Sequence, residues 1–340
     1  MQVFFAPETD AHAPEAFLAR GRLVPNEERA ERAALLLRAV EGCGLHPVSP
    51  PRHGAGPCLA VHTPAYLGFL SEAWEAWRAL PGAGPEVIPN VHPHRGWGSY
   101  PEHVVGRAGW HMADTAAPIG PGTATAALRA ADCAVAAADA VLAGAARAYA
   151  LCRPPGHHAY ADMAGGHCFL NNAAIAAARL RTRHDRVAVF DIDVHHGNGT
   201  QGIFHARGDV LTVSVHADPA RFYPFFCGYA HERGEGAGFG ANLNLPLPLG
   251  SGDGAWLAAL AQGMAAVEAF EPGAVVVALG LDAHASDPLA GLAVSTEGFR
   301  AAGRLIGACP LPMALTQEGG YLSPHLSDIL TAFLDGLLSA

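Results

Sequence analysis

The chain has 340 residues, half of them hydrophobic, which favours one large α/β domain with a sizeable core over two small domains. Acidic residues exceed basic ones by 31 − 21 = 10, so a nucleic-acid-binding surface, which needs a basic face, is not expected. No apolar run reaches the roughly 20 residues of a membrane span, and the first residues lack a secretory signal pattern, so no membrane partner is expected.

Short apolar segments alternate with alanine-rich segments along the chain, which predicts a mostly parallel sheet covered by helices on both faces. The predicted strands are 2–5, 147–152, 187–192, 210–216, 274–281 and 311–315. The predicted helices are 26–42, 64–80, 122–145, 172–182, 254–270, 296–307 and 324–338. Asn26 and Ser295 are the expected N-caps of the first and sixth of these helices.

One long segment, 81–121, interrupts this alternation. It is rich in proline and glycine, and no helical or strand period runs through most of it. A loop of this length in a compact domain is usually functional or disordered. Trp97, Tyr100, Trp110 and His111 favour an ordered, packed loop.

Chemically useful side chains follow four of the predicted strands. Ligands of open parallel sheets bind beyond the carboxyl ends of the strands, so these segments are expected to meet in one pocket. The segments are RPPGHHA at 153–159, DVHHGNGT at 193–200, Asp282-Ala283-His284, and Gln317-Glu318-Gly319-Gly320-Tyr321.

The first candidate site is a metal site. Residues two apart in a strand point to the same side, so Asp191, Asp193 and His195 face together. Asp193 and His195 can chelate one divalent cation, and Asp282 can complete a set of three ligands. Three protein ligands with an open position are typical of catalytic zinc, and Fe(II) or Co(II) also suits two carboxylates and one imidazole. The alternative is a helix-capping acid beside solvated histidines.

The second candidate is a catalytic group around that metal site. His157 and His158 are adjacent, and neighbouring imidazoles with different partners can form a proton-transfer pair. Asp191 is placed to orient one of them. Tyr321 follows two glycines, which allow a tight turn, and its hydroxyl can donate to an oxyanion. Surface imidazoles and a core tyrosine are the alternatives.

The seven cysteines, which are scattered and contain no CxxC pair, indicate neither a disulfide framework nor a cysteine-based zinc site. A reducing cytoplasm is therefore the expected location.

Together these segments resemble the histone deacetylase and acetylpolyamine amidohydrolase superfamily. The matching motifs cover the chain from about 150 to 321 in the family's order, and the N-terminal third resembles the bacterial acetylpolyamine amidohydrolases more loosely. The motifs are RPPGHHA (153–159), GGHCFLNNAAIAA (165–177), FDIDVHHGNGTQ (190–201), SVHADP (214–219), GLDAHASDPL (280–289) and QEGGY (317–321).

The resemblance implies a single deacetylase domain over 1–340 with an arginase-like α/β sheet, in which 81–121 is an insertion at the active-site mouth and a possible dimer contact. It implies zinc on Asp193, His195 and Asp282, His158 as general base, and Tyr321 at the substrate carbonyl. His157, paired with Asp191, would give electrostatic help. A structural potassium ion is implied near Asp191, Asp193, His195, Ser214 and Val215.

Three positions depart from the commoner family pattern. Asn198 stands where some members have an aspartate behind the second histidine, which leaves that histidine a neutral partner. His167, which follows Gly166, and Tyr223 line the implied acyl tunnel, where many members have phenylalanine. These polar aromatics suit a substrate with a hydrophilic or charged chain.

The expected activity is therefore zinc-dependent removal of acetyl groups from N-acetylated amines by a homodimer. Small cationic acetylpolyamines are the first candidate substrates, with Asp114 as a candidate partner for a distal ammonium. Acetyl-lysine in peptides is the alternative substrate. An arginase-type ureohydrolase with two manganese ions and a non-catalytic binding protein are the remaining alternatives.

Overall fold

The computed structural model describes residues 1–94, 97–289 and 291–340. In this part of the chain, eight strands form one sheet in the order β4-β1-β5-β10-β9-β6-β7-β8, and every neighbouring pair is parallel. The strands are β1 Gln2–Phe4, β4 Pro47–Val48, β5 Arg147–Ala150, β6 Val187–Asp191, β7 Val210–Ala217, β8 Asn242–Leu247, β9 Ala274–Leu279 and β10 Met313–Gln317. The predicted α/β fold class is confirmed.

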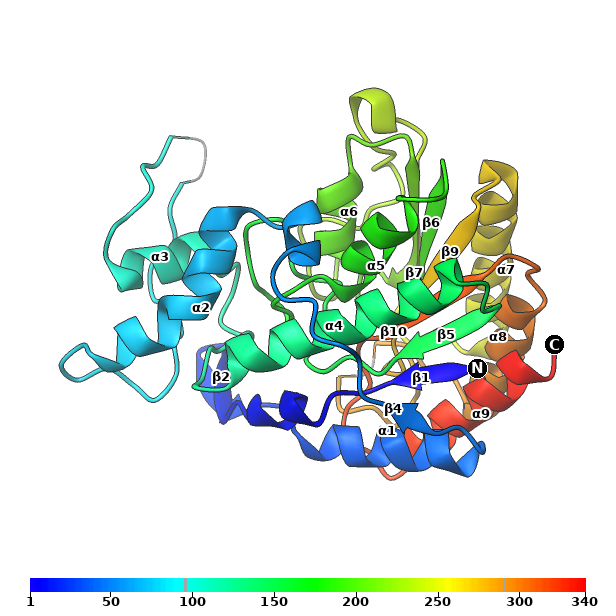
Figure 1. Cartoon of the computed structure of the whole chain (residues 1–340), viewed down its shortest axis with the longest axis horizontal. Helices are drawn as coiled ribbons and strands as arrows, with labels where there is room; N and C mark the ends of the chain where they lie inside the picture. The colour runs from blue at the N-terminus through cyan, green and yellow to red at the C-terminus, as the bar shows by residue number, and fades with distance from the viewer. Residues whose placement is uncertain (95–96, 290) are drawn as a thin grey trace.

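Helices cover both faces of the sheet, as Figure 1 shows. On one face lie α4 Thr123–Leu142, α5 Asn172–Leu180 and α6 Asn198–Phe204. Beside them, α2 Pro64–Arg78 and α3 Val104–His111 project from the body and share a hydrophobic cluster with α4 and α5. On the other lie α1 Glu31–Gly42, α7 Asp253–Phe270, α8 Thr296–Gly307 and α9 Leu326–Leu338. Short 3₁₀ helices occupy Pro7–Ala11, Pro57–Ala60 and Gly236–Gly238.

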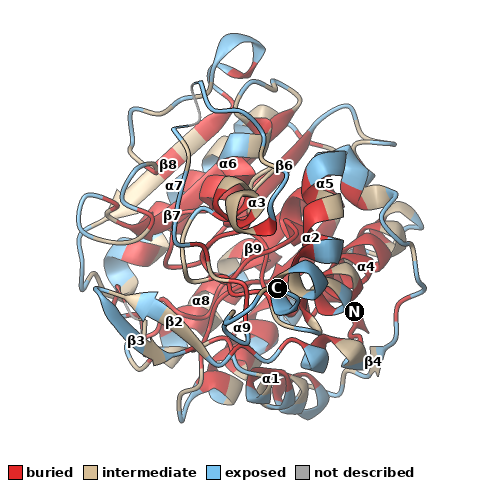
Figure 2. Ribbon diagram, turned by 90° about the vertical axis from the view of Figure 1, so that its left-hand side faces the viewer, coloured by how far each residue is buried: buried red, intermediate tan, exposed pale blue. Residues whose placement is uncertain are grey.

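The central strands are buried on both faces, which explains their continuous apolar sequence. In β9, Val275 and Val277 pack in the cluster that includes α8 and α9, whereas Val276 and Ala278 pack in the cluster that includes α4 and α5. Figure 2 shows these strands as a buried centre beneath partly exposed helices. The sheet is therefore a rigid platform whose strand ends can hold side chains in fixed positions.

Some predicted boundaries differ from the structure. Ser295 caps α8 as predicted, accepting a hydrogen bond from the backbone N of Gly298 at 3.0 Å. Asn26 does not cap α1: its Oδ1 accepts from the backbone N of Glu28, which closes a local turn, and the helix begins at Glu31. The side chain of Asn26 thus offers the backbone N of Glu28 a local hydrogen bond in a turn, in place of the hydrogen bonds of a helix.

A hairpin of β2 Ala16–Ala19 and β3 Arg22–Pro25 lies outside the main sheet and was not predicted. Its two-residue turn, Arg20-Gly21, has positive φ at both positions, 51° and 75°. Such turns usually contain asparagine or aspartate before the glycine, so the sequence lacks the strongest hairpin signal.

The segment 81–121 contains α3, which was not predicted. His111 anchors it, because its Nε2 lies 2.9 Å from the Tyr100 hydroxyl and its Nδ1 lies 2.7 Å from the carbonyl oxygen of Asp162. Trp97, by contrast, is 80% exposed and does not pack inside. Figure 1 shows this segment with α2 and α3 projecting from the body of the molecule.

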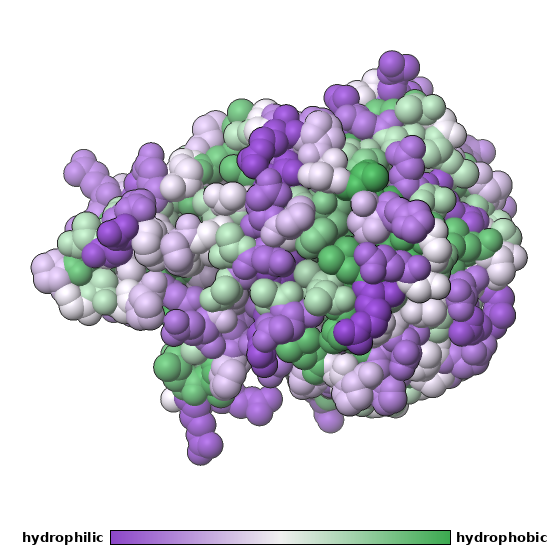
Figure 3. Space-filling model, turned by 60° about the horizontal axis from the view of Figure 1, so that its bottom comes forward, coloured by the Kyte–Doolittle hydropathy of each residue, from purple (hydrophilic) through white to green (hydrophobic). Residues whose placement is uncertain are grey.

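Figure 3 shows one face of the surface, on which hydrophilic residues predominate and hydrophobic residues form small separate groups. No helix in the described part of the chain has the length and apolar character needed to cross a membrane.

Candidate active site

The four strand ends with useful side chains belong to four neighbouring strands. In the sheet order, β5, β10, β9 and β6 follow one another, so the segments after them lie side by side. Three of them contribute His158, His195 and Tyr321 to the lining of a cavity of about 710 Å³, and the fourth places Asp282 against His195. Three of the four segments therefore line one cavity, and the Asp282 segment lies behind it.

Asp193, His195 and Asp282 form a compact buried group. Their potential ligand atoms all lie within 4.8 Å of one another. Nδ1 of His195 lies 3.1 Å from Oδ1 of Asp193 and 3.2 Å from Oδ2 of Asp282. Burial and the adjoining Asp193 raise the pKa of Asp282. Two buried carboxylates this close need a compensating cation, so this donor set fits a divalent metal ion with three protein ligands.

Glycines allow the chain to approach these carboxylates closely. A Cβ atom on Gly319 would lie 2.1 Å from Oδ2 of Asp282, and one on Gly280 would lie 2.3 Å from Oδ2 of Asp193. The backbone N of Gly319 donates to Oδ2 of Asp193 at 2.8 Å. These glycines therefore let the β9 and β10 ends close around the metal-ligand candidates.

The tandem histidines differ in position and in partners. His158 lines the cavity, and its Nδ1 donates to Oδ1 of Asn198 at 2.5 Å. His157 lies behind it, with Nδ1 2.8 Å from Oδ2 of Asp191, and the two ring centroids are 4.0 Å apart. Asp191 therefore orients His157, as the sequence predicted for one of the pair.

The environment separates the two imidazoles in pKa. For His157, burial disfavours the charged form, but Asp193 and Asp191 outweigh it and raise the pKa to about 10. For His158, burial and the neighbouring His157 and His195 hold the pKa well below its usual value. His158 is thus the neutral ring beside the cavity, whereas His157 carries the positive charge.

Glu318 supports the histidine pair and was not singled out from the sequence, although it lies within the QEGGY motif. Its Oε2 accepts hydrogen bonds from the backbone N atoms of Gly156 (2.6 Å) and His157 (3.0 Å). Burial raises its pKa to about 7. With His157 and Cys168 it forms the other three-residue group of potential metal ligands in the described chain. Glu318 is the one carboxylate of that group, and its Oε2 already accepts hydrogen bonds from the loop that carries the two histidines.

Tyr321 lines the cavity and is held by its backbone and its ring. Its backbone N donates to Oδ2 of Asp287 at 2.7 Å, and the guanidinium carbon of Arg32 lies 4.8 Å from its ring centroid. Nε of Arg32 also donates to the carbonyl oxygen of Gly320 at 2.6 Å, where φ is 111°. Sequence reasoning missed Arg32, because α1 lies far from the QEGGY motif in the chain.

The predicted substrate-contacting residues also gather at this cavity. Gly166, His167 and Tyr223 line it, and Asp114 adjoins them. The carboxylate of Asp114 accepts from the Tyr223 hydroxyl at 2.6 Å and from the backbone N of Gly166 at 3.1 Å. Asp114 therefore fixes the cavity wall through two hydrogen bonds.

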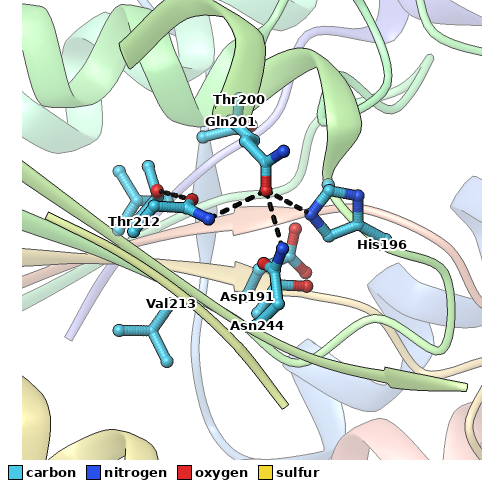
Figure 4. A pocket seen from close by; sticks show the side chains of 11 residues that line it. Asp191, His196, Thr200, Gln201, Thr212, Val213 and Asn244 are labelled. Carbon is cyan, nitrogen blue, oxygen red and sulfur yellow. Dashed lines mark hydrogen bonds between the residues drawn. The ribbon is translucent and has the colours of Figure 1, made fainter. Parts of the chain in front are cut away.

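His196, the second histidine of the DVHH motif, points away from the cavity. It reaches a small buried space of about 10 Å³ behind Asp191, shown in Figure 4. There Oε1 of Gln201 lies 3.0 Å from Nε2 of His196 and accepts from the side-chain amides of Asn242 (3.0 Å) and Asn244 (2.8 Å). Asn242 and Asn244 are structural neighbours of the site that the sequence did not indicate.

The histone deacetylase domain family matches residues 26–337. The chain is 45% identical to the acetylpolyamine amidohydrolase of Burkholderia pseudomallei (strain 1710b), over 99% of this chain and 98% of that protein. It is 39% identical to the acetylpolyamine amidohydrolase of Mycoplana ramosa, over 99% of each. A crystal structure of acetylpolyamine aminohydrolase from B. pseudomallei superimposes with a TM-score of 0.96, at 44% identity and covering 99% and 98% of the chains.

These matches confirm the predicted resemblance and remove the ureohydrolase and the non-catalytic alternatives. The domain of this family implies a bound metal ion. The chain belongs to the histone deacetylase family and is a hydrolytic deacetylase.

Proposed function

We propose that this enzyme hydrolyses the acetyl amide of N-acetylated acyclic amines, with acetylpolyamines as a substrate class and Zn²⁺ on Asp193, His195 and Asp282. The observation that carries the proposal is the convergence of His158, His195 and Tyr321 on one cavity. The names of the relatives support the substrate class. Fe(II) or Co(II) suits the same ligands.

Zn²⁺ held by this group would supply Lewis-acid chemistry, polarising a carbonyl and lowering the pKa of water. His158 is the proposed general base, because it is the tandem histidine that lines the cavity. It takes a proton from water as the water oxygen attacks the acetyl carbon. The Tyr321 hydroxyl donates a hydrogen bond to the carbonyl oxygen as negative charge develops there.

The C–N bond then breaks, and protonated His158 returns its proton to the amine nitrogen, so the products are acetate and the free amine. His157 stays paired with Asp191 behind it and contributes positive charge near the developing oxyanion.

A structural potassium ion near Asp191, Asp193, His195, Ser214 and Val215 is part of the proposal. Asp191 and Ser214 are register partners on β6 and β7, which places oxygen atoms of both strands together. Hard cations of this kind take oxygen ligands. Thermal melting in K⁺ and in an equal concentration of tetramethylammonium should differ if this ion is bound.

The alternative substrate is acetyl-lysine in peptides. His167 and Tyr223 make the cavity wall polar and aromatic, which suits a hydrophilic chain. The test is kcat/KM on N-acetylputrescine and on an acetyl-lysine peptide with zinc-loaded enzyme, with a hydroxamate as inhibitor control. Faster hydrolysis of the peptide would contradict the acetylpolyamine assignment, and hydrolysis of neither would contradict the proposed activity.

We further propose a homodimer formed through the segment 81–121, in a cytoplasmic enzyme. Val91, Trp97 and Tyr100 on this projecting segment are 51%, 80% and 47% exposed, and such apolar groups favour association. The seven cysteines are all free, which supports a reducing compartment. Trp97→Ser should shift the mass measured by light scattering from dimer to monomer, and an unchanged dimer would contradict this contact.

A further inference from the structure

Three arginines lie at the mouth of the active-site cavity. Arg20 and Arg22 belong to the β2–β3 hairpin, and Arg221 belongs to the segment after β7. All three side chains are exposed, and Figure 2 shows the hairpin at the surface. Among the described residues, none of the three forms an ion pair or a side-chain hydrogen bond. Three uncompensated positive charges therefore face the same opening.

No carboxylate balances them on the cavity wall. The cavity lining in the described part of the chain contains these arginines, histidines, tyrosines and apolar residues, but no aspartate or glutamate. Asp114 adjoins the cavity, but its oxygens already accept from Tyr223 and Gly166. This local excess of positive charge is opposite in sign to the chain as a whole, which carries a net charge of −10.

The arginine positions also suit recognition of an anion. Phe17, Phe222 and Leu289 line the same cavity, so part of the wall is apolar and the local dielectric is lower than in water. Guanidinium groups match the geometry of carboxylates and can bind them through two hydrogen bonds. Arg20 is held with φ at 51°, a conformation that costs energy for a residue other than glycine.

We propose that Arg20, Arg22 and Arg221 bind an anionic group at the far end of the substrate, so that the enzyme also hydrolyses N-acetyl amines that end in a carboxylate. This inference rests on the proposed deacetylase function and adds a substrate class to it. The reaction is the same hydrolysis. Water adds to the acetyl carbon, the C–N bond breaks, the nitrogen takes a proton, and the products are acetate and an amino acid.

The test compares three acetamides of nearly equal length that differ in terminal charge: 4-acetamidobutanoate, N-acetylputrescine and N-butylacetamide. The triple variant Arg20→Gln, Arg22→Gln, Arg221→Gln should lower kcat/KM about tenfold for the carboxylate, since each exposed ion pair contributes up to about 1 kcal/mol. It should raise kcat/KM for the ammonium compound, because a repulsion is removed. The neutral compound should change less than about twofold.

The matched control is Arg38→Gln. Arg38 is exposed on α1 and does not line the cavity, so its substitution removes one positive charge elsewhere, as each single variant does at the mouth. It should leave all three kcat/KM values unchanged. For the wild type at low substrate concentration, added salt should reduce the rate on the carboxylate substrate, because screening weakens exposed charge interactions. The rate on the neutral substrate should not change.

An unchanged ratio of carboxylate to neutral kcat/KM in the triple variant would overturn this inference and leave the proposed deacetylase function intact. Failure of the wild type to hydrolyse any of the three acetamides would contradict the proposed function, and the inference with it. A retained rate on N-butylacetamide shows that the triple variant is folded. The three single variants provide a second measurement, since each should show part of the decrease in kcat/KM for the carboxylate.

Discussion

Nδ1 of His158 makes one hydrogen bond in the described structure. It donates to Oδ1 of Asn198, at a distance of 2.5 Å. The adjacent His157 has a carboxylate, that of Asp191, in the corresponding place. The two neighbouring imidazoles thus differ by one negative charge in their partners. That difference favours a neutral His158, which the proposed general base must be.

The first prediction follows from this relationship. Asn198→Asp places a carboxylate beside His158 and should raise its pKa, as an opposite charge at hydrogen-bond distance does. A base with a higher pKa stays protonated to higher pH, so the acid limb of the kcat/KM profile should move upward. Tyr160→Phe is the control, because it removes the contact that Asn198 Nδ2 makes with the Tyr160 hydroxyl at 3.1 Å without adding charge. An acid limb that stays in place in Asn198→Asp would contradict the role of His158.

The second prediction concerns the hydroxyl of Tyr321. Tyr321→Phe removes the proposed oxyanion donor but keeps the ring beneath Arg32, so kcat should fall tenfold to about a thousandfold while the metal stays bound. Tyr229 does not line the cavity, although its hydroxyl donates to the carbonyl of the lining residue Phe225, so Tyr229→Phe should change kcat far less. Steady-state kinetics with a metal assay checks both. An unchanged kcat in Tyr321→Phe would exclude this donor role.

The third prediction concerns the metal ligands. Asp282→Asn keeps the size of the side chain and an acceptor for the backbone N of Val194, but removes one negative charge. Zinc measured by mass spectrometry after dialysis should fall from about one equivalent to near zero, because a catalytic site has three protein ligands. Glu268→Gln, an exposed change on α7, should retain its zinc.

A loss of fold can be separated from this loss of metal. In the metal-free enzyme, Asp282→Asn removes one of two adjoining buried carboxylates, so its free energy of unfolding should not fall below that of the metal-free wild type. Full zinc occupancy in Asp282→Asn would remove Asp282 from the ligand set.

The fourth prediction concerns stability at low pH. Burial lowers the pKa of His62 to about 4, and its Nε2 accepts from the backbone N of Asn171 at 2.9 Å. Between pH 6.5 and 4 the unfolded chain binds this proton and the folded chain does not, so the contribution of His62 is present above pH 6.5 and is lost as the pH falls toward 4. His62→Gln keeps an acceptor but cannot bind the proton.

Urea unfolding at pH 7 and pH 5 measures this effect. Lowering the pH should reduce the free energy of unfolding of the wild type by about 1–2 kcal/mol more than that of His62→Gln. Equal losses in the two proteins would show that His62 does not carry this pH dependence.

Much of the site could be predicted because its residues sit in short motifs directly after apolar strands. Asp193 and His195 follow β6, and Tyr321 follows β10, where strand alternation and the parallel sheet constrain their directions. The hairpin at 16–25 and α3 escaped prediction, because an Arg-Gly turn and an eight-residue helix carry weak local signals.

The sequence by itself determined the strand-and-helix alternation, the identity of the candidate ligands and the tandem histidines, since these depend on local spacing. Only the tertiary structure decided which histidine faces the cavity, that Arg32 supports Tyr321, and that Arg20 and Arg221 meet at one mouth. The physical reason is that contacts between residues 200 positions apart depend on the order of strands in the sheet and on loop paths, which no local pattern encodes.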